Sequence, residues 1–166
     1  MLRDIALGTL AGAAGTVALN ITTYLDMALR GRPSSETPAK VAEKLAAGAG
    51  VDLSAQPAQS DDREEVAQQR ASGLGALMGY ATGLGVGTAY GVLRLAVRDV
   101  PVPLAGVVLG AGAMASSDVP SVKLRVTNPS QWGTSGWLAD IVPHLAYGLV
   151  TAAVYESLLD RGGRRR

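Results

Sequence analysis

Asp140 and His144 are ionisable residues whose spacing could support acid–base chemistry. Residues four apart lie on one face of an α-helix, so the carboxylate and the imidazole can contact each other. Histidine changes charge near neutral pH, which suits it to accepting and releasing protons. Tyr147 and Thr151 continue the same helical face. The pattern predicts either a path for protons or a small solute, or a set of interhelical hydrogen bonds that fixes helix register.

Further polar residues fall inside or beside uncharged runs. Asn20 lies near the middle of the first run, in line with Thr16 and Thr23, and Asp118 closes the third run. Ionisable groups at membrane depth are rare and mark functional sites by default. We therefore predict a polar seam formed by Asn20, Asp118, Asp140, His144 and Tyr147. Asp26 and Glu156 lie near the ends of runs, where we expect interfacial charges.

Composition excludes several kinds of chemistry. The chain has no cysteine and one histidine, so disulfides, thiolate catalysis and multi-histidine zinc sites are ruled out. The net charge of +1 gives no basic field for nucleic acid. The glycine-rich segment 110–115 matches G-x-G-x-x-A, but it lies in a run of small residues without the strand that a dinucleotide-binding motif needs. We expect no enzyme activity, no cofactor and no metal site.

The elements that must position the polar residues are four long uncharged or nearly uncharged segments. A helix needs about 20 apolar residues to cross a bilayer. The sequence predicts one membrane domain over residues 1–166, an all-α bundle of four transmembrane helices. The expected spans are 5–28, 71–94, 100–119 and 137–158, with an extramembrane connection at 30–70.

Small residues recur at four-residue intervals in these spans. The second span carries Gly75, Gly79, Gly83, Gly87 and Gly91. Such a series lets a neighbouring backbone approach closely, at a crossing angle typical of small-xxx-small contacts between membrane helices. The partner could be another helix of this chain or another protein, and the sequence leaves both open.

Local signals mark the remaining boundaries. Thr37 as N-cap and Pro38 as first helical residue predict a short helix that ends near Gly48. Asp61 to Glu64 has the spacing of a capping box and predicts a helix that runs unbroken into the second span. Pro120, just after Asp118, predicts a polar break near the edge of the bilayer.

The distribution of basic residues predicts the orientation. Four spans place both termini and the turn at 94–98 on one side, and seven arginines lie close to the membrane there. Five basic residues flank the membrane on the other side. Because cytoplasmic flanks carry the excess of Lys and Arg, we expect both termini in the cytoplasm.

The order of these features resembles the YagU-like proteins of bacterial inner membranes. The resemblance rests on Arg32-Pro33 after a glycine-rich first span, Tyr90-Gly91 in the second, and an Asp and a Pro closing the third. Trp137 and the stretch from His144 to Gly148 in the fourth complete it. It implies a small multi-span protein of the bacterial inner (cytoplasmic) membrane and brings no established biochemical activity.

Two functions follow as hypotheses. The first is a permeation or transport element that uses the polar seam, embedded in the lipid bilayer as a single chain or a homo-oligomer. The second is a non-catalytic subunit or scaffold of a larger membrane assembly, docked through the glycine face of the second span.

Overall fold

The computed structural model describes residues 1–54, 63–97 and 99–163, and this part of the chain is all-α, as predicted. Five α-helices and one short 3-10 helix occur in it, and no strand. Their bounds are α1 Leu2–Arg30, α2 Thr37–Gly48, α3 Arg63–Leu93, α4 Val102–Lys123, η1 Pro129–Gln131 and α5 Gly133–Gly163.

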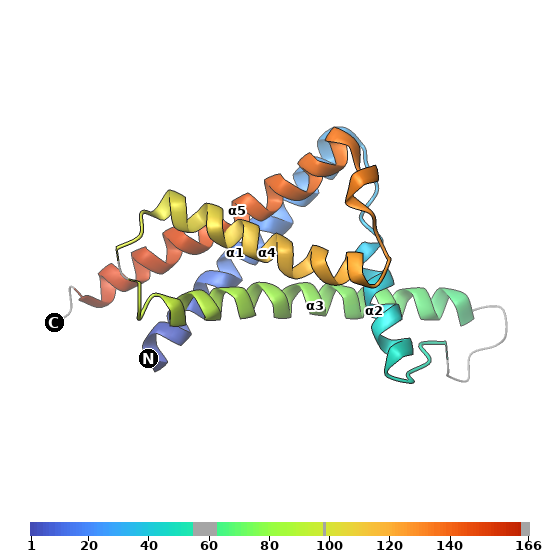
Figure 1. Cartoon of the computed structure of the whole chain (residues 1–166), viewed down its shortest axis with the longest axis horizontal. Coiled ribbons are helices and arrows are strands. Elements are labelled where there is room, and N and C mark those ends of the chain that lie inside the picture. Colours follow the sequence, from blue (N-terminus) through green and yellow to red (C-terminus); the bar gives the residue numbers. More distant parts are fainter. Residues whose placement is uncertain (55–62, 98, 164–166) are drawn as a thin grey trace.

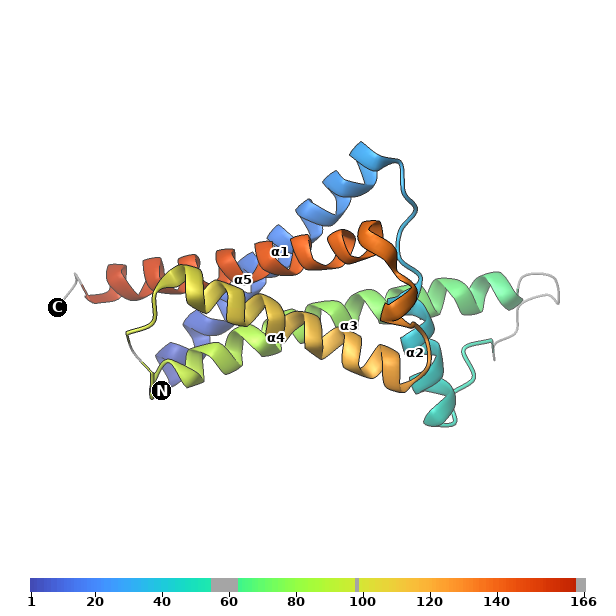
Figure 2. The same ribbon diagram turned by 45° about the horizontal axis from the view of Figure 1, so that its top comes forward.

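The four long helices alternate in direction (Figure 1). The start of α1 and the end of α5 lie together, because Arg3 Nη2 donates to the carbonyl oxygen of Leu159 at 3.1 Å. At the opposite end Arg30 Nη1, in the last turn of α1, donates to Ser135 Oγ at 2.7 Å. Figure 2 shows the helices diverging toward this second end, where α2 crosses α3.

Three helices, α1, α4 and α5, are long and apolar enough to cross a membrane. The fourth predicted span, in α3, does not reach the same hydropathy, although it is uncharged from Ala71 to Leu93. The glycine, threonine and tyrosine residues of this segment lower its mean hydropathy below that of a segment rich in leucine and valine. The hydropathy of the helices therefore supports three of the four spans.

The long helices approach each other through glycine. A Cβ added at Gly12 of α1 would lie 2.7 Å from the carbonyl oxygen of Gly83 and 3.0 Å from the Cα of Gly87, both on α3. Between α4 and α5, a Cβ added at Gly148 would lie 2.9 Å from the Cα of Gly110. Any larger side chain at these positions would have to push the helices apart.

Large apolar side chains lie mostly on the outside. Leu10, Val17 and Ile21 of α1 are more than half exposed, and so are Leu104 and Val107 of α4. The buried cluster between the helices is small and contains Ala11, Tyr90, Ala105, Leu109, Ala152 and Tyr155. Contiguous exposed apolar surface of this kind marks a membrane or protein interaction face in a folded chain.

Two predicted boundaries differ in detail. Helix α2 begins at Thr37, one residue earlier than expected, with Glu36 as its N-cap and no side-chain cap bond. Helix α4 continues through Asp118 and Pro120 to Lys123 where a break was expected. Pro120 cannot donate to the carbonyl oxygen of Ser116, but the turn after it still closes, because Leu124 N–H donates to the carbonyl oxygen of Pro120 at 2.9 Å. Helix α3 runs unbroken from Arg63, while the capping residues Asp61 and Asp62 lie outside the described residues.

Candidate functional site

Asp140 and His144 contact each other on α5. The Nδ1 atom of His144 lies 3.2 Å from Asp140 Oδ1 and 2.8 Å from the backbone carbonyl oxygen of Asp140. The side chains are 21 % and 15 % exposed, so both are largely withdrawn from solvent. The second carboxylate oxygen, Asp140 Oδ2, is buried and, apart from the neighbouring Asp118 carboxyl, has no hydrogen-bond partner within the described chain.

Asp118 joins this pair from α4. It is half-buried and is an electrostatic neighbour of both Asp140 and His144. The glycines of α4 account for the proximity, because a Cβ added at Gly110 would lie only 2.7 Å from the carbonyl oxygen of His144. Asp118, Asp140 and His144 therefore form one cluster across the α4–α5 contact, which we call the acid–imidazole cluster.

Tyr147 lies farther along α5 and contacts two other helices. Its hydroxyl donates to the carbonyl oxygen of Gly83 on α3 at 2.6 Å, and the residue is 1 % exposed. Its backbone and ring lie against Gly15 of α1. Asn20 is half-buried on α1, and no hydrogen bond among the described residues joins it to the acid–imidazole cluster.

The five glycines of α3 have different neighbours. Gly83, Gly87 and Gly91 pack against α1, whereas Gly75 packs against the backbone of Pro38 at the start of α2. A Cβ added at Gly79 would meet nothing within 4 Å. Most of the series is thus used within the chain itself.

A second buried charged cluster was not identified from the sequence. Arg94 Nη2, one residue after α3, lies 2.5 Å from Glu156 Oε1 on α5, with the two side chains 7 % and 25 % exposed. The rings of Tyr90 and Tyr155 meet edge to face beside this ion pair, 5.1 Å apart. Arg94 was expected in a turn and Glu156 at an interface. Residues so far apart in sequence have no spacing that could have predicted the contact.

Other charged groups lie at the diverging end and outside the bundle. Asp26 accepts hydrogen bonds from both Arg30 and Arg32, beside a hollow of about 210 Å³ between α1 and α5. On the exposed face of α2, the Lys40 ammonium lowers the pKa of the Glu36 carboxyl by hydrogen bonding to it.

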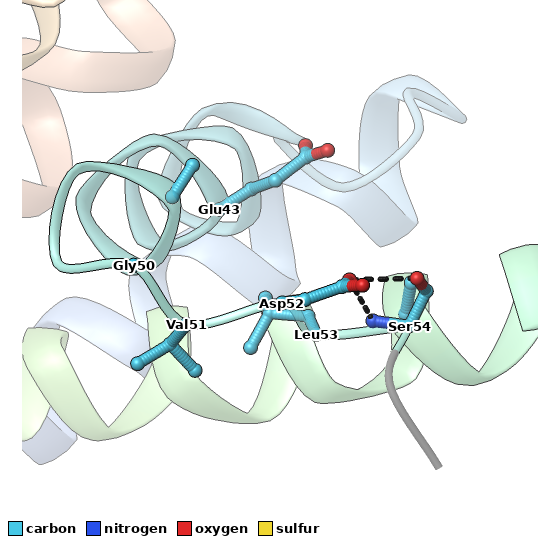
Figure 3. A pocket seen from close by; sticks show the side chains of 8 residues that line it. Glu43, Gly50, Val51, Asp52, Leu53 and Ser54 are labelled. Atoms are coloured by element: carbon cyan, nitrogen blue, oxygen red, sulfur yellow. Dashed lines mark hydrogen bonds between the residues drawn. The ribbon is translucent and has the colours of Figure 1, made fainter. Parts of the chain in front are cut away.

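A larger hollow of about 390 Å³ lies where α2 and the segment after it meet α3. Figure 3 shows Glu43 and Asp52 at its edge, with Asp52 accepting hydrogen bonds from the backbone and hydroxyl of Ser54. This hollow lies in the polar connection, apart from the acid–imidazole cluster. In the described part of the chain, no group of three or more His, Asp and Glu side chains is placed to hold a metal ion.

Comparisons with protein-family models, with curated proteins and with solved structures found no match to this chain. The resemblance to the YagU-like proteins stays a prediction. The arrangement of the residues is therefore the basis for any assignment of function.

Proposed function

We propose that the protein is a small multi-pass protein of the bacterial inner membrane, with four transmembrane helices, and that it carries protons or a small solute through its polar seam. Helices α1, α4 and α5 are apolar enough to cross the bilayer. We assign the fourth crossing to α3, because its uncharged segment lies backbone to backbone with α1. The glycine contacts would then act as small-xxx-small packing in lipid.

The observation that carries the transport proposal is the acid–imidazole cluster. The carboxyl of Asp118 on α4 lies close to the carboxyl of Asp140 and the imidazole of His144 on α5, and the three side chains are largely or partly buried. Ionisable side chains cost about 2.5–3.5 kcal/mol each at the centre of a membrane helix, and where they occur they commonly form proton relays or ion paths. The Asp118 carboxyl lies within hydrogen-bonding reach of Asp140, so a proton could be shared between α4 and α5.

Flux through reconstituted vesicles tests the proposal. Purified protein in liposomes should dissipate an imposed proton gradient, and His144→Ala and Asp140→Asn should each slow that flux. Asp160→Asn is the matched control, because Asp160 is exposed near the end of α5, away from the cluster. A wild-type rate equal to that of empty liposomes, for protons and for a panel of small solutes, would rule the proposal out.

The scaffold function has one observation in its favour. Gly73, Gly79 and Gly85 of α3 have open space around them, so a partner helix could approach there. Since Gly83, Gly87 and Gly91 are already covered by α1, this surface is smaller than the sequence predicted. Co-purification of a partner in mild detergent, lost in Gly79→Leu, would support the scaffold over transport.

A further inference from the structure

Two arginines share one carboxylate where α1 ends. Arg30 donates to both oxygens of Asp26, with Nε at 2.5 Å and Nη2 at 2.7 Å, and Arg32 donates to the same carboxylate with Nε. One negative charge therefore faces two positive ones, and these two residues, which we call the arginine pair, keep a net positive charge. Their side chains are 33 % and 21 % exposed, so both guanidinium groups can be reached from outside the chain.

The two guanidinium groups differ in how they are held. Arg30 is fixed against α5, because its Nη1 donates to Ser135 Oγ at 2.7 Å. The Nη1 of Arg32 donates to the carbonyl oxygen of Pro33 at 3.1 Å, and its Nη2 has no hydrogen-bond partner among the described residues. Guanidinium N–H groups bind phosphate and carboxylate oxygens in pairs. Arg32 can therefore still donate to an anionic group that approaches from outside.

The hollow of about 210 Å³ adjoins the arginine pair and lies between α1 and α5 at the end where the helices diverge (Figure 2). Its lining residues are Thr22, Asp26, Arg30, Leu138, Val142 and Pro143. The charged lining residues stand in the last two turns of α1, and Val142 and Pro143 lie one turn deeper in α5 than Leu138. The hollow is thus charged at its rim and apolar on its α5 side.

The rim of the hollow stands at the level expected for lipid headgroups. The first predicted span ends at residue 28, just before Arg30. At the same end of the bundle the rings of Trp132 and Trp137 lie 5.1 Å apart, and tryptophan is enriched where a membrane meets water. A phosphate at this level would meet the arginine pair, and a hydrocarbon chain attached to it would extend toward Val142.

We propose that the hollow between α1 and α5 binds one anionic phospholipid, with the phosphate on the arginine pair and part of one acyl chain against Leu138 and Val142. Basic pockets between transmembrane helices bind anionic headgroups, and the net positive charge here favours an anionic lipid over a zwitterionic one. The hollow is smaller than the roughly 300–1,000 Å³ that encloses a drug-sized ligand, so it suits a single chain. The site requires that α1 and α5 cross the bilayer, for which both are apolar enough, and it does not depend on transport.

The two tryptophans of the chain provide the measurement. Full-length protein in phosphatidylcholine nanodiscs is titrated with phosphatidylglycerol that carries a nitroxide on its acyl chain, since a nitroxide close to tryptophan quenches its fluorescence. Half-maximal quenching should come at a mole fraction about fivefold lower than with phosphatidylcholine carrying the same nitroxide, the factor that corresponds to one basic residue near an anionic lipid. Equal quenching by the two lipids would overturn the site.

Arg32→Gln tests the headgroup contact and leaves the Arg30–Asp26 pair in place. The mole fraction of phosphatidylglycerol at half-maximal quenching should rise about fivefold, because the net positive charge is lost. Arg125→Gln is the matched control, since it removes an exposed guanidinium just after α4, at the same end of the bundle and away from the hollow. An equal rise in both variants would mean diffuse attraction to the surface and would overturn the site.

Val142→Phe tests the acyl part without changing any charge. The added ring should fill the hollow and raise the mole fraction about fourfold, the factor that corresponds to one methylene group displaced from an apolar contact. Ile141→Phe is the control, because the two side chains are exposed to nearly the same extent, 45 % and 44 %, and only Val142 lines the hollow. Equal effects of the two variants would overturn the acyl contact.

Inorganic phosphate distinguishes a lipid from a free anion at the arginine pair. Unlabelled phosphatidylglycerol should restore tryptophan fluorescence in nanodiscs that hold the nitroxide lipid, and dissolved phosphate at the same total concentration should not. Restoration by phosphate to the same extent would show that the phosphate group alone is bound, and it would overturn the lipid as the ligand.

Discussion

The hydroxyl of Tyr147 donates a hydrogen bond to the carbonyl oxygen of Gly83, 64 residues away, at 2.6 Å. The tyrosine comes from α5 and the glycine from α3, and Gly15 of α1 packs against the same tyrosine. Three helices therefore meet at one buried side chain. A residue there can hold the register of the bundle.

Tyr147→Phe should weaken the bundle modestly. The substitution removes one buried hydrogen bond and leaves the ring in place, so we expect a loss of about 0.6–1.5 kcal/mol in the free energy of unfolding. Unfolding in mixed micelles, followed by circular dichroism, measures the change. Tyr24→Phe, at a position 63 % exposed, should have no effect. Equal stability of Tyr147→Phe and the parent protein would show that the bond does not hold the bundle together.

Gly87→Ala and Gly79→Ala should have opposite effects, although both add one methyl group to α3. At Gly87 the new Cβ would lie 2.5 Å from the Cα of Gly12, and at Gly79 it would meet nothing within 4 Å. Overpacking of this kind costs about 1–3 kcal/mol, whereas alanine is favoured over glycine in a helix by up to about 1 kcal/mol. Thermal unfolding in detergent compares the two directly. A stabilised Gly87→Ala protein would contradict the close α1–α3 contact.

The sequence predicts the helices well because their signals are local. Uncharged runs, Pro38 near a helix start and Gly48 at a helix end specify α1 to α5 to within a few residues. The continuation of α4 past Pro120 was missed, since a proline removes one backbone hydrogen bond and by local rules favours a break, whereas here the turn after Pro120 still closes.

The site is harder to predict, because it depends on which helices meet. The spacing of Asp140 and His144 predicts their contact, but it says nothing of Asp118 on another helix. The sequence could not predict which helix packs against the glycine series either, because a glycine allows any neighbouring backbone to approach closely. Nothing in the sequence predicts the Arg94–Glu156 ion pair, because the two residues come together only in the folded chain.

The membrane topology gives a prediction that distinguishes four membrane-spanning helices from three. With α3 crossing the membrane, Ser35→Cys and Thr134→Cys should react with an impermeant maleimide in intact cells, and Asp160→Cys only after lysis. These positions are exposed at opposite ends of the bundle, and the chain has no native cysteine to interfere. If α3 stays outside the bilayer, the start of α1 and the end of α5 would lie on opposite sides of the membrane. Asp160→Cys would then react with the maleimide in intact cells.

Glu156→Gln should be the most destabilising single change at the α3–α5 contact. It leaves the Arg94 guanidinium, whose side chain is 7 % exposed, without its countercharge. Breaking a buried ion pair costs about 3–5 kcal/mol, and we expect the lower end because Glu156 is partly exposed. The same unfolding measurement in micelles applies, with Glu65→Gln on the exposed start of α3 as the control.

Replacing both partners tests whether the loss comes from the stranded charge. In Arg94→Met with Glu156→Met, two apolar side chains of similar length fill the space and no buried charge is left, so most of the stability should return. Recovery would attribute the loss in Glu156→Gln to the unpaired guanidinium. A double variant as unstable as Glu156→Gln alone would mean that the ion pair itself, with the Tyr90–Tyr155 contact beside it, holds α3 against α5.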